Sequence, residues 1–112
     1  MASTWTAPGL SEGDAQKVVD RLQQRLVSLI DLHLTLKHIH WNVVGPTFIS
    51  VHEMLDPQTD AVRGYSDEVA ERIATLGGVP NGLAGAVVEQ RGWNDYSLGR
   101  DTVARHLSLI HI

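Results

Sequence analysis

The chain has 112 residues, which is enough for one compact domain with a single apolar core. It contains no cysteine, which excludes disulfides, thiolate metal sites and a cysteine nucleophile, so that any metal ligands must be His, Asp or Glu. The formal net charge of −4 excludes a surface that is basic throughout, the kind that binds nucleic acid by neutralising phosphates.

No export signal or membrane span is recognisable in the sequence. Residues 1–9 lack a basic cluster followed by an apolar run, and the longest apolar stretch, 27–36, is interrupted by Asp31 and His33. Because the chain also lacks cysteine, we expect a soluble protein of the cytoplasm with no membrane partner, and association with the nucleoid is left open.

An alternation of four- and three-residue steps predicts a long amphipathic helix over about residues 12–44. Ser11 and Asp14 resemble a capping box at its start, and Gly45-Pro46 supplies a stop. The residues that line its core face in this pattern are Ala15, Val19, Leu22, Leu26, Leu29, His33, Leu36, His40 and Val43.

The same alternation resumes after the turn and predicts a second helix that packs on the first and ends at Gly77-Gly78. Pro57 lacks a backbone donor, so we expect it to kink or split this helix. Turn-forming residues predict a loop over 79–86, followed by a short apolar piece at 93–98 and a new helical pattern over 100–109. The second core-facing set is Phe48, His52, Leu55, Thr59, Val62, Ser66, Val69, Ile73 and Leu76.

Two pairs of polar residues on the second helix have spacings that suit a metal site. His52 and Asp56 are one turn apart on one face, and so are Asp67 and Glu71. The two pairs are separated by eleven residues, which at ~1.5 Å rise is roughly 16 Å, too far to share one ion. A second, antiparallel copy of the helix, related by a two-fold axis near residues 61 and 62, would bring pairs from two chains together.

The same residues also have simpler interpretations, which stay open at this point. Pairs of this kind are typical of a solvated helix surface, and His33 and His40 on a core stripe are typical of hydrogen-bonded core residues. The run HEMLD, from His52 to Asp56, is superficially similar to the HExxH helix of zinc proteases, but its fifth residue is Asp rather than His.

Two runs, LTLKHIHWNVVGPTFISVHEMLD (Leu34–Asp56) and DEVAERIATLGGVP (Asp67–Pro80), resemble the signature of the Dps family of starvation-induced miniferritins. The resemblance implies an all-α, ferritin-like four-helix bundle subunit, with residues 1–112 as a single domain and a short helix in the loop after the second helix. It also implies a ferroxidase site shared by two subunits. The ligands match the HWN, HExxD and DxxAER motifs and are His40, His52, Asp56, Asp67 and Glu71.

The resemblance further implies an enzyme, a ferroxidase that binds iron as Fe(II), oxidises it with an oxidant such as hydrogen peroxide and stores Fe(III) inside a dodecameric cage, and the ligand set suits this chemistry. Removing iron and peroxide together would protect DNA and the cell from oxidative damage. Zinc could occupy the same nitrogen and oxygen ligands. Trp41 is interpreted first as a space-filling anchor, with interception of an escaping radical as the alternative. No metal role is assigned to His33 or His38.

The chain departs from the family pattern near its C-terminus. Only the start of the third helix is present and the fourth is absent, so we expect the first two helices to expose an apolar face that aggregates or recruits other chains. Inactivity of this truncated chain on its own is a further expectation. Residues 107–112 read LSLIHI, which matches one translation of a transposase end sequence used in sequencing adapters, and the other interpretation is ordinary apolar helix.

A structural, DNA-compacting protein without significant iron oxidation is the alternative function, and an inert helical bundle is a third. In the family, DNA binding often comes from a Lys-rich tail, but residues 1–14 contain no Lys or Arg. These residues therefore give no support to DNA as a partner.

Overall fold

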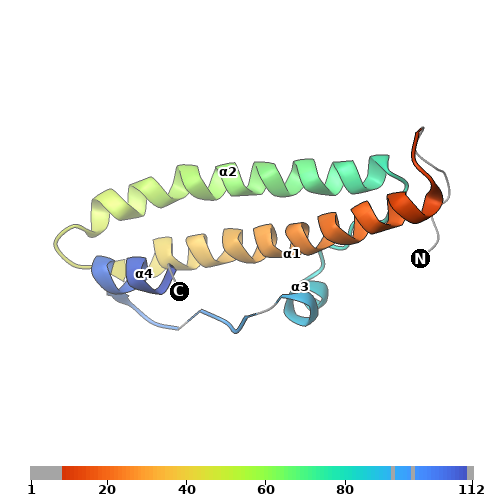
Figure 1. Ribbon diagram of the computed structural model, residues 1–112. Helices are drawn as coiled ribbons and strands as arrows, with labels where there is room; N and C mark the ends of the chain where they lie inside the picture. Colours follow the sequence, from red (N-terminus) through yellow and green to blue (C-terminus); the bar gives the residue numbers. More distant parts are fainter. Residues whose placement is uncertain (1–8, 92, 97, 111–112) are drawn as a thin grey trace.

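The computed structural model describes residues 9–91, 93–96 and 98–110, and for residues 107–110 it describes the backbone only. Two long antiparallel helices form a hairpin, and the shorter elements lie along one side of it, so that the molecule is elongated, with principal extents of 55 × 24 × 20 Å (Figure 1). In chain order the elements are α1 (Glu12–Asn42), β1 (Val43–Val44), α2 (Phe48–Thr75), α3 (Ala84–Gln90), β2 (Asp101–Thr102) and α4 (Val103–Ile110). The expected helical architecture is confirmed, with the two-residue strands β1 and β2 as the only departures among the described residues.

The first helix begins where its capping residues predict and ends two residues early. The Ser11 hydroxyl accepts a hydrogen bond from the backbone N–H of Asp14 at 3.1 Å, which satisfies one of the donors left open at a helix start. After Asn42 the chain becomes extended, and Val43 pairs in parallel with Asp101 between β1 and β2. The prediction of helix through residue 44 is wrong because a distant segment offers these last two residues strand hydrogen bonds.

The second helix is continuous through Pro57, so the expected split does not occur. The proline leaves the carbonyl of Glu53 without its helical donor, but Glu53 is exposed, so water can satisfy that oxygen. Packing holds the helix on both sides of the proline, because Leu55 and Thr59 are both buried against the rest of the molecule.

The end of α2 is a Schellman motif formed by the two glycines that the sequence marks as a stop. Gly77 has a positive φ of 87°, and its N–H donates to the carbonyl of Ala74. The N–H of Gly78 donates to the carbonyl of Ile73 at 2.9 Å, which completes the paired hydrogen bonds of this motif.

The hairpin is held together by two apolar clusters. One contains Val19, Leu26 and Ile73, with partly buried neighbours packed around them, and lies toward the end of the hairpin where α2 stops. The other contains Leu36, Ile39 and Leu55 and lies toward the turn between the helices; Tyr96 packs against it.

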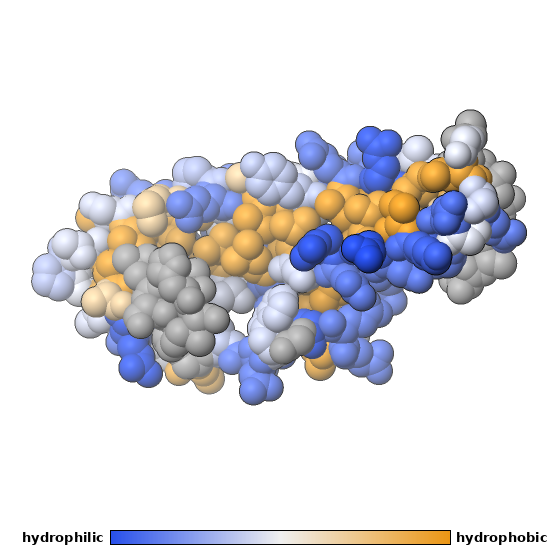
Figure 2. Space-filling view, viewed as in Figure 1, coloured by the Kyte–Doolittle hydropathy of each residue, from blue (hydrophilic) through white to orange (hydrophobic). Residues whose placement is uncertain are grey.

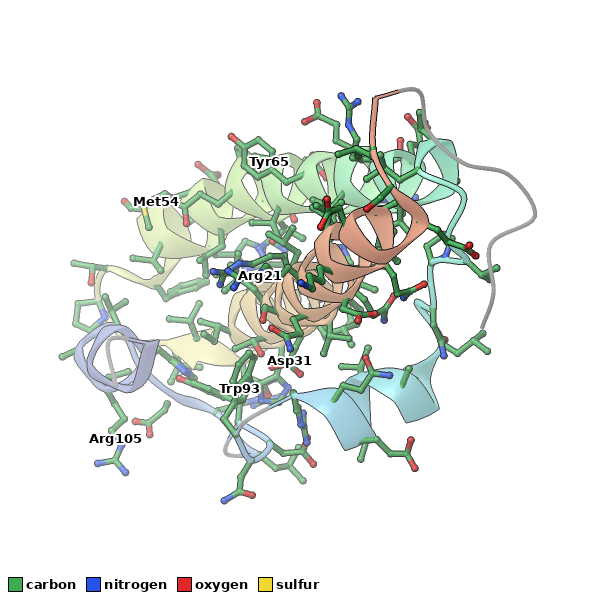
Figure 3. All side chains as sticks on the ribbon, turned by 45° about the vertical axis from the view of Figure 1, so that its right-hand side comes forward. Arg21, Asp31, Met54, Tyr65, Trp93 and Arg105 are labelled. Atoms are coloured by element: carbon green, nitrogen blue, oxygen red, sulfur yellow. The ribbon has the colours of Figure 1, made fainter. Side chains whose placement is uncertain are left out.

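A second buried face of α1 departs from the predicted core stripe. Leu29 and His33 are only half-buried, whereas Val27 and Asp31 are buried. The Asp31 carboxylate accepts hydrogen bonds from Arg91, at 2.9 Å, and from the indole N–H of Trp93. Figure 3 shows Asp31 and Trp93 beside one another where the segment after α3 crosses α1. This segment covers the second face, which is why the face is buried.

The loop after α2 contains the expected short helix, α3. The predicted loop at 79–86 is wrong in its last three residues, because α3 begins at Ala84. The Gln23 side chain fastens this loop to α1 by bonding both backbone groups of Asn81, at 2.9 Å and 3.0 Å. The last helix begins at Val103 rather than at Arg100. Of the LSLIHI run, His111 and Ile112 lie outside the described residues.

An apolar band is exposed along the hairpin. Figure 2 shows hydrophobic residues following most of the length of this face. Over the two long helices as a whole, and not on this face alone, exposed large apolar residues include Leu32, Leu34, Phe48, Ile49 and Met54. This agrees with the expectation that the two long helices lack part of their packing partners. Among the described residues, no helix combines the length and apolarity needed to cross a membrane.

Replacing Gly78 tests the close packing at the end of α2. In Gly78→Ala the new Cβ would lie 2.7 Å from Cγ1 of Val19 and 3.0 Å from Cγ2 of Ile73. Val19 is β-branched and helical, so it has no other comfortable rotamer, and we expect a loss of about 1–3 kcal/mol in the free energy of unfolding. Urea denaturation followed by circular dichroism measures it.

The matched control is Gly13→Ala in the first turn of α1, where a Cβ would meet nothing within 4 Å. This change should leave stability unchanged or raise it by up to about 1 kcal/mol. If the two variants had equal free energies of unfolding, the packing of Val19 and Ile73 against Gly78 would have room for a methyl group.

Candidate metal centre

The turn between α1 and α2 brings two histidines face to face. His40 lies in the last turn of α1 and His52 in the first turns of α2, and their rings stack with centroids 3.6 Å apart and planes inclined by 17°. Gly45, with φ of 115°, allows the chain to reverse in so few residues. His40 is buried and His52 is half-buried.

The side chain of each histidine forms a hydrogen bond with the backbone carbonyl of the other. Nδ1 of His40 lies 2.6 Å from the carbonyl oxygen of His52, and Nδ1 of His52 lies 2.7 Å from the carbonyl oxygen of His40. A carbonyl only accepts, so both Nδ1 atoms carry a proton and donate. In the neutral rings this leaves both Nε2 atoms with a lone pair, the form in which histidine binds a metal ion.

The third predicted ligand, Asp56, lies beside this pair. Its Oδ1 is 3.7 Å from Nε2 of His40. Ligand atoms of one ion lie about 2 Å from it, so this separation is close to that of two atoms sharing a cation. Two imidazoles and a carboxylate are ligands that suit Fe(II) as well as Zn(II).

Lys37 is a member of this group that the sequence did not reveal. Its Nζ donates to Oδ1 of Asp56 at 2.6 Å. This hydrogen bond is the main cause that holds the pKa of Asp56 below its ordinary value, and the positive charge of Lys37 acts in the same direction. Lys37 precedes His40 by three residues, which was the available signal, because that spacing places both side chains on one helix face.

The structure does not bring the other two predicted ligands to this place. Asp67 and Glu71 are exposed and lie further along α2, and Asp67 borders an open hollow of about 730 Å³ that Leu26 and Ile30 also line. Within the part of the chain that the structure describes, no group of three or more His, Cys, Asp or Glu is close enough to hold a metal ion. One chain therefore presents the predicted ligands in two separate groups, and that they bind a metal ion stays a prediction.

Trp41 does not have the position that the sequence suggested. Its side chain is 67% exposed, so it fills no space among the described residues of this chain, and the interpretation as a space-filling anchor of the bundle stays a prediction. The residue follows His40 on α1 and points to the outside of the hairpin, because the preceding histidine takes the inward position.

Comparison with known proteins identifies the fold family. Residues 19–109 match the family model described as ferritin-like domain. The chain is 59% identical over 110 residues to the DNA protection during starvation protein of Mycolicibacterium smegmatis, a match that covers 98% of this chain and 60% of the relative. It is 55% identical over 107 residues to the fine tangled pili major subunit of Haemophilus ducreyi, covering 96% and 57%.

Solved structures agree. The tetragonal form of Mycobacterium smegmatis Dps superimposes with a TM-score of 0.93 at 60% identity, over 96% of this chain and 66% of that one. DpsA14 from Streptomyces coelicolor superimposes with a TM-score of 0.94 at 54% identity, over 98% and 66%. The chain thus spans about 60% of the length of the first curated relatives that it matches.

Removing the ammonium group tests the electrostatics of Asp56. In Lys37→Met the strongest cause that lowers the pKa of Asp56 is absent, so that pKa should rise toward its ordinary value. Carboxylate chemical shifts followed through a pH titration by NMR measure the change. Lys17→Met, which removes the chain's other lysine from an exposed position on α1, should leave the pKa unchanged. An unmoved Asp56 in the first variant would contradict the pairing.

Proposed function

The chain belongs to the ferritin-like family and, within it, to the Dps proteins, and we propose that it binds Fe(II) and oxidises it at a site completed by a second copy of the chain. Hydrogen peroxide is the proposed oxidant. The observation that carries this proposal is the stacked pair of His40 and His52. Their Nδ1 protons are committed to the backbone, and Nε2 of His40 faces the carboxylate of Asp56.

The ligands fit iron as a substrate. Neutral imidazole nitrogens of His40 and His52 suit Fe(II), and carboxylate oxygens favour the harder Fe(III) product. Lys37 neutralises Asp56 in this chain, so an arriving cation takes the place of the ammonium group on that carboxylate. Hydrogen peroxide accepts two electrons in becoming water or hydroxide, so each peroxide oxidises two Fe(II) ions to Fe(III). Zinc, which accepts the same ligands, would compete with iron.

A second subunit supplies the missing carboxylates in this proposal. If two α2 helices cross antiparallel near residues 61 and 62, Asp67 and Glu71 of one chain lie opposite His52 and Asp56 of the other, and two equivalent sites form. Gly64, where a Cβ would meet nothing within 4 Å in this chain, leaves room for such an approach. Continued assembly into a dodecameric cage would give the Fe(III) product a place to be stored.

Protection of DNA follows from this chemistry without contact to DNA. Consuming ferrous iron and peroxide together removes both reactants that generate hydroxyl radicals. A DNA-compacting protein without iron oxidation remains the alternative, and it predicts a salt-sensitive gel shift that His52→Ala leaves unchanged.

Subunit mixing tests whether the site is shared. The histidine set is His40, His52 and Asp56 of one chain, and the acidic set is Asp67 and Glu71 of its partner. His52→Ala breaks the histidine set and Glu71→Ala breaks the acidic set, so each variant alone should oxidise almost no Fe(II). A dimer of one His52→Ala chain and one Glu71→Ala chain has two different sites. In one site both sets carry a substitution, and in the other both sets are intact. After random reassortment, half of the pairs are mixed, and about a quarter of the wild-type activity should return. Anaerobic Fe(II) oxidation after addition of peroxide, followed by the absorbance of the ferric product, measures it.

The control is Glu68→Ala, which removes an exposed carboxylate of the same helix from between Asp67 and Glu71 and should retain full activity. A mixture that stays inactive would contradict a site shared between chains. Full activity of Glu71→Ala alone would show that the acidic set takes no part in the reaction.

A further inference from the structure

A partly buried tyrosine and a buried histidine form a hydrogen-bonded pair beside the apolar cluster near the turn between α1 and α2. Oη of Tyr96, in the segment before β2, is 2.7 Å from Nδ1 of His106 on α4, and the two rings stack with centroids 5.8 Å apart. His106 is 1% exposed. Neither residue belongs to the proposed iron ligands, and the iron chemistry described above gives neither a role.

The surroundings of His106 fix where the protons are. Nε2 of His106 is 3.4 Å from the backbone carbonyl oxygen of Asn42, which can only accept, so Nε2 carries the proton of the neutral ring. Nδ1 then has a lone pair, and the Tyr96 hydroxyl donates to it. Burial raises the pKa of Tyr96, so the phenol keeps its proton at neutral pH.

Packing connects this pair to the iron-binding histidines. Tyr96 lies against the cluster of Leu36, Ile39 and Leu55, which Val51 also joins. Ile39 and Val51 directly precede the two stacked histidines in the sequence. The edge of the Tyr96 ring also meets the ring of His38, with centroids 5.6 Å apart. The phenol is thus joined to the metal site through packed side chains of the core.

We propose that Tyr96 is a redox-active residue that gives one electron to an oxidant formed at the iron site while its proton passes to Nδ1 of His106. This inference rests on the proposed iron oxidation. The oxidant is a hydroxyl radical, which forms when one Fe(II) gives a single electron to hydrogen peroxide and the O–O bond breaks, leaving Fe(III) and hydroxide.

The step balances in atoms and electrons. The hydroxyl radical takes the electron of Tyr96 and becomes hydroxide, and the O–H proton of the phenol moves to Nδ1, leaving a neutral tyrosyl radical beside a protonated His106. A second Fe(II) returns one electron to the tyrosyl radical, the proton moves back from Nδ1, and Fe(III) results. The sum is two Fe(II) oxidised by one peroxide, with Tyr96 and His106 restored and the radical held on Tyr96 until the second Fe(II) reduces it.

The chain provides its own comparison, because Tyr65 is its only other tyrosine. Tyr65 is 55% exposed on the side of α2 that faces away from α1 (Figure 3). It has no hydrogen-bond partner among the described residues, and so no base to receive its proton. Tyr96→Phe therefore removes a phenol hydroxyl that has a hydrogen-bonded base, and Tyr65→Phe removes one that has none.

The experiment is freeze-quench EPR after peroxide is added to the Fe(II)-loaded protein, with ring-deuterated tyrosine identifying the signals that come from tyrosine. A tyrosyl signal should form in the wild type and in Tyr65→Phe, and should be lost in Tyr96→Phe. In His106→Phe, which keeps the stacked ring but removes the proton acceptor, the signal should be weaker and shorter-lived. Circular dichroism confirms that each variant is folded.

The outcomes separate this inference from the proposed function. Persistence of the tyrosyl signal in Tyr96→Phe, or its absence from a wild type that oxidises Fe(II) normally, would overturn the relay and leave the ferroxidase intact. If the wild type oxidises no Fe(II), the proposed function fails, and a photo-oxidant in solution tests the relay alone in the Tyr65→Phe background. In that background, a tyrosyl radical that decays more slowly in D₂O supports the relay. A decay rate that neither D₂O nor His106→Phe changes overturns it.

Discussion

The reciprocal hydrogen bonds between His40 and His52 are the constraint on which the rest of the structure depends. Each ring donates a hydrogen bond to the backbone of the facing helix, so these bonds fix the position of the end of α1 along the start of α2. The same bonds decide which nitrogen of each ring is left for a metal ion. A structural contact and the preparation of ligands are thus one interaction, and neither histidine can be replaced without losing both.

A hairpin of two helices explains why one chain would hold only part of the proposed site. Four of the five proposed ligands lie on α2, and a straight helix spreads them along its axis instead of gathering them. His40 joins His52 and Asp56 from across the turn, whereas no further His, Cys, Asp or Glu joins Asp67 and Glu71 into a metal-binding group among the described residues. The exposed apolar band on the hairpin gives a second chain a reason to bind. Apolar burial and completion of the site therefore favour the same association.

Periodic features could be predicted from the sequence, and contacts between distant segments could not. The extents of the two long helices, the capping Ser11 and the glycine stop after α2 all follow from local rules. Burial of Asp31 depends on Arg91 and Trp93, about sixty residues away, and no local pattern pairs them. The two-residue strand β1 exists only because β2 lies beside it. Pro57 suggested a broken helix, but packing on both sides of it outweighs one missing hydrogen bond.

The last turns of α1, from Lys37 to Asn42, serve both polar centres at once. Lys37 and His40 turn toward Asp56, whereas His38 meets Tyr96 and the carbonyl of Asn42 accepts from His106. Because this one segment carries both centres, a shift of its backbone would move the proposed iron ligands and the tyrosine–histidine pair together. Changes within it would not separate the two proposed activities. Only residues that approach from elsewhere, such as Glu71 from the far end of α2 or Tyr96 from the loop before β2, report on one centre without disturbing the other.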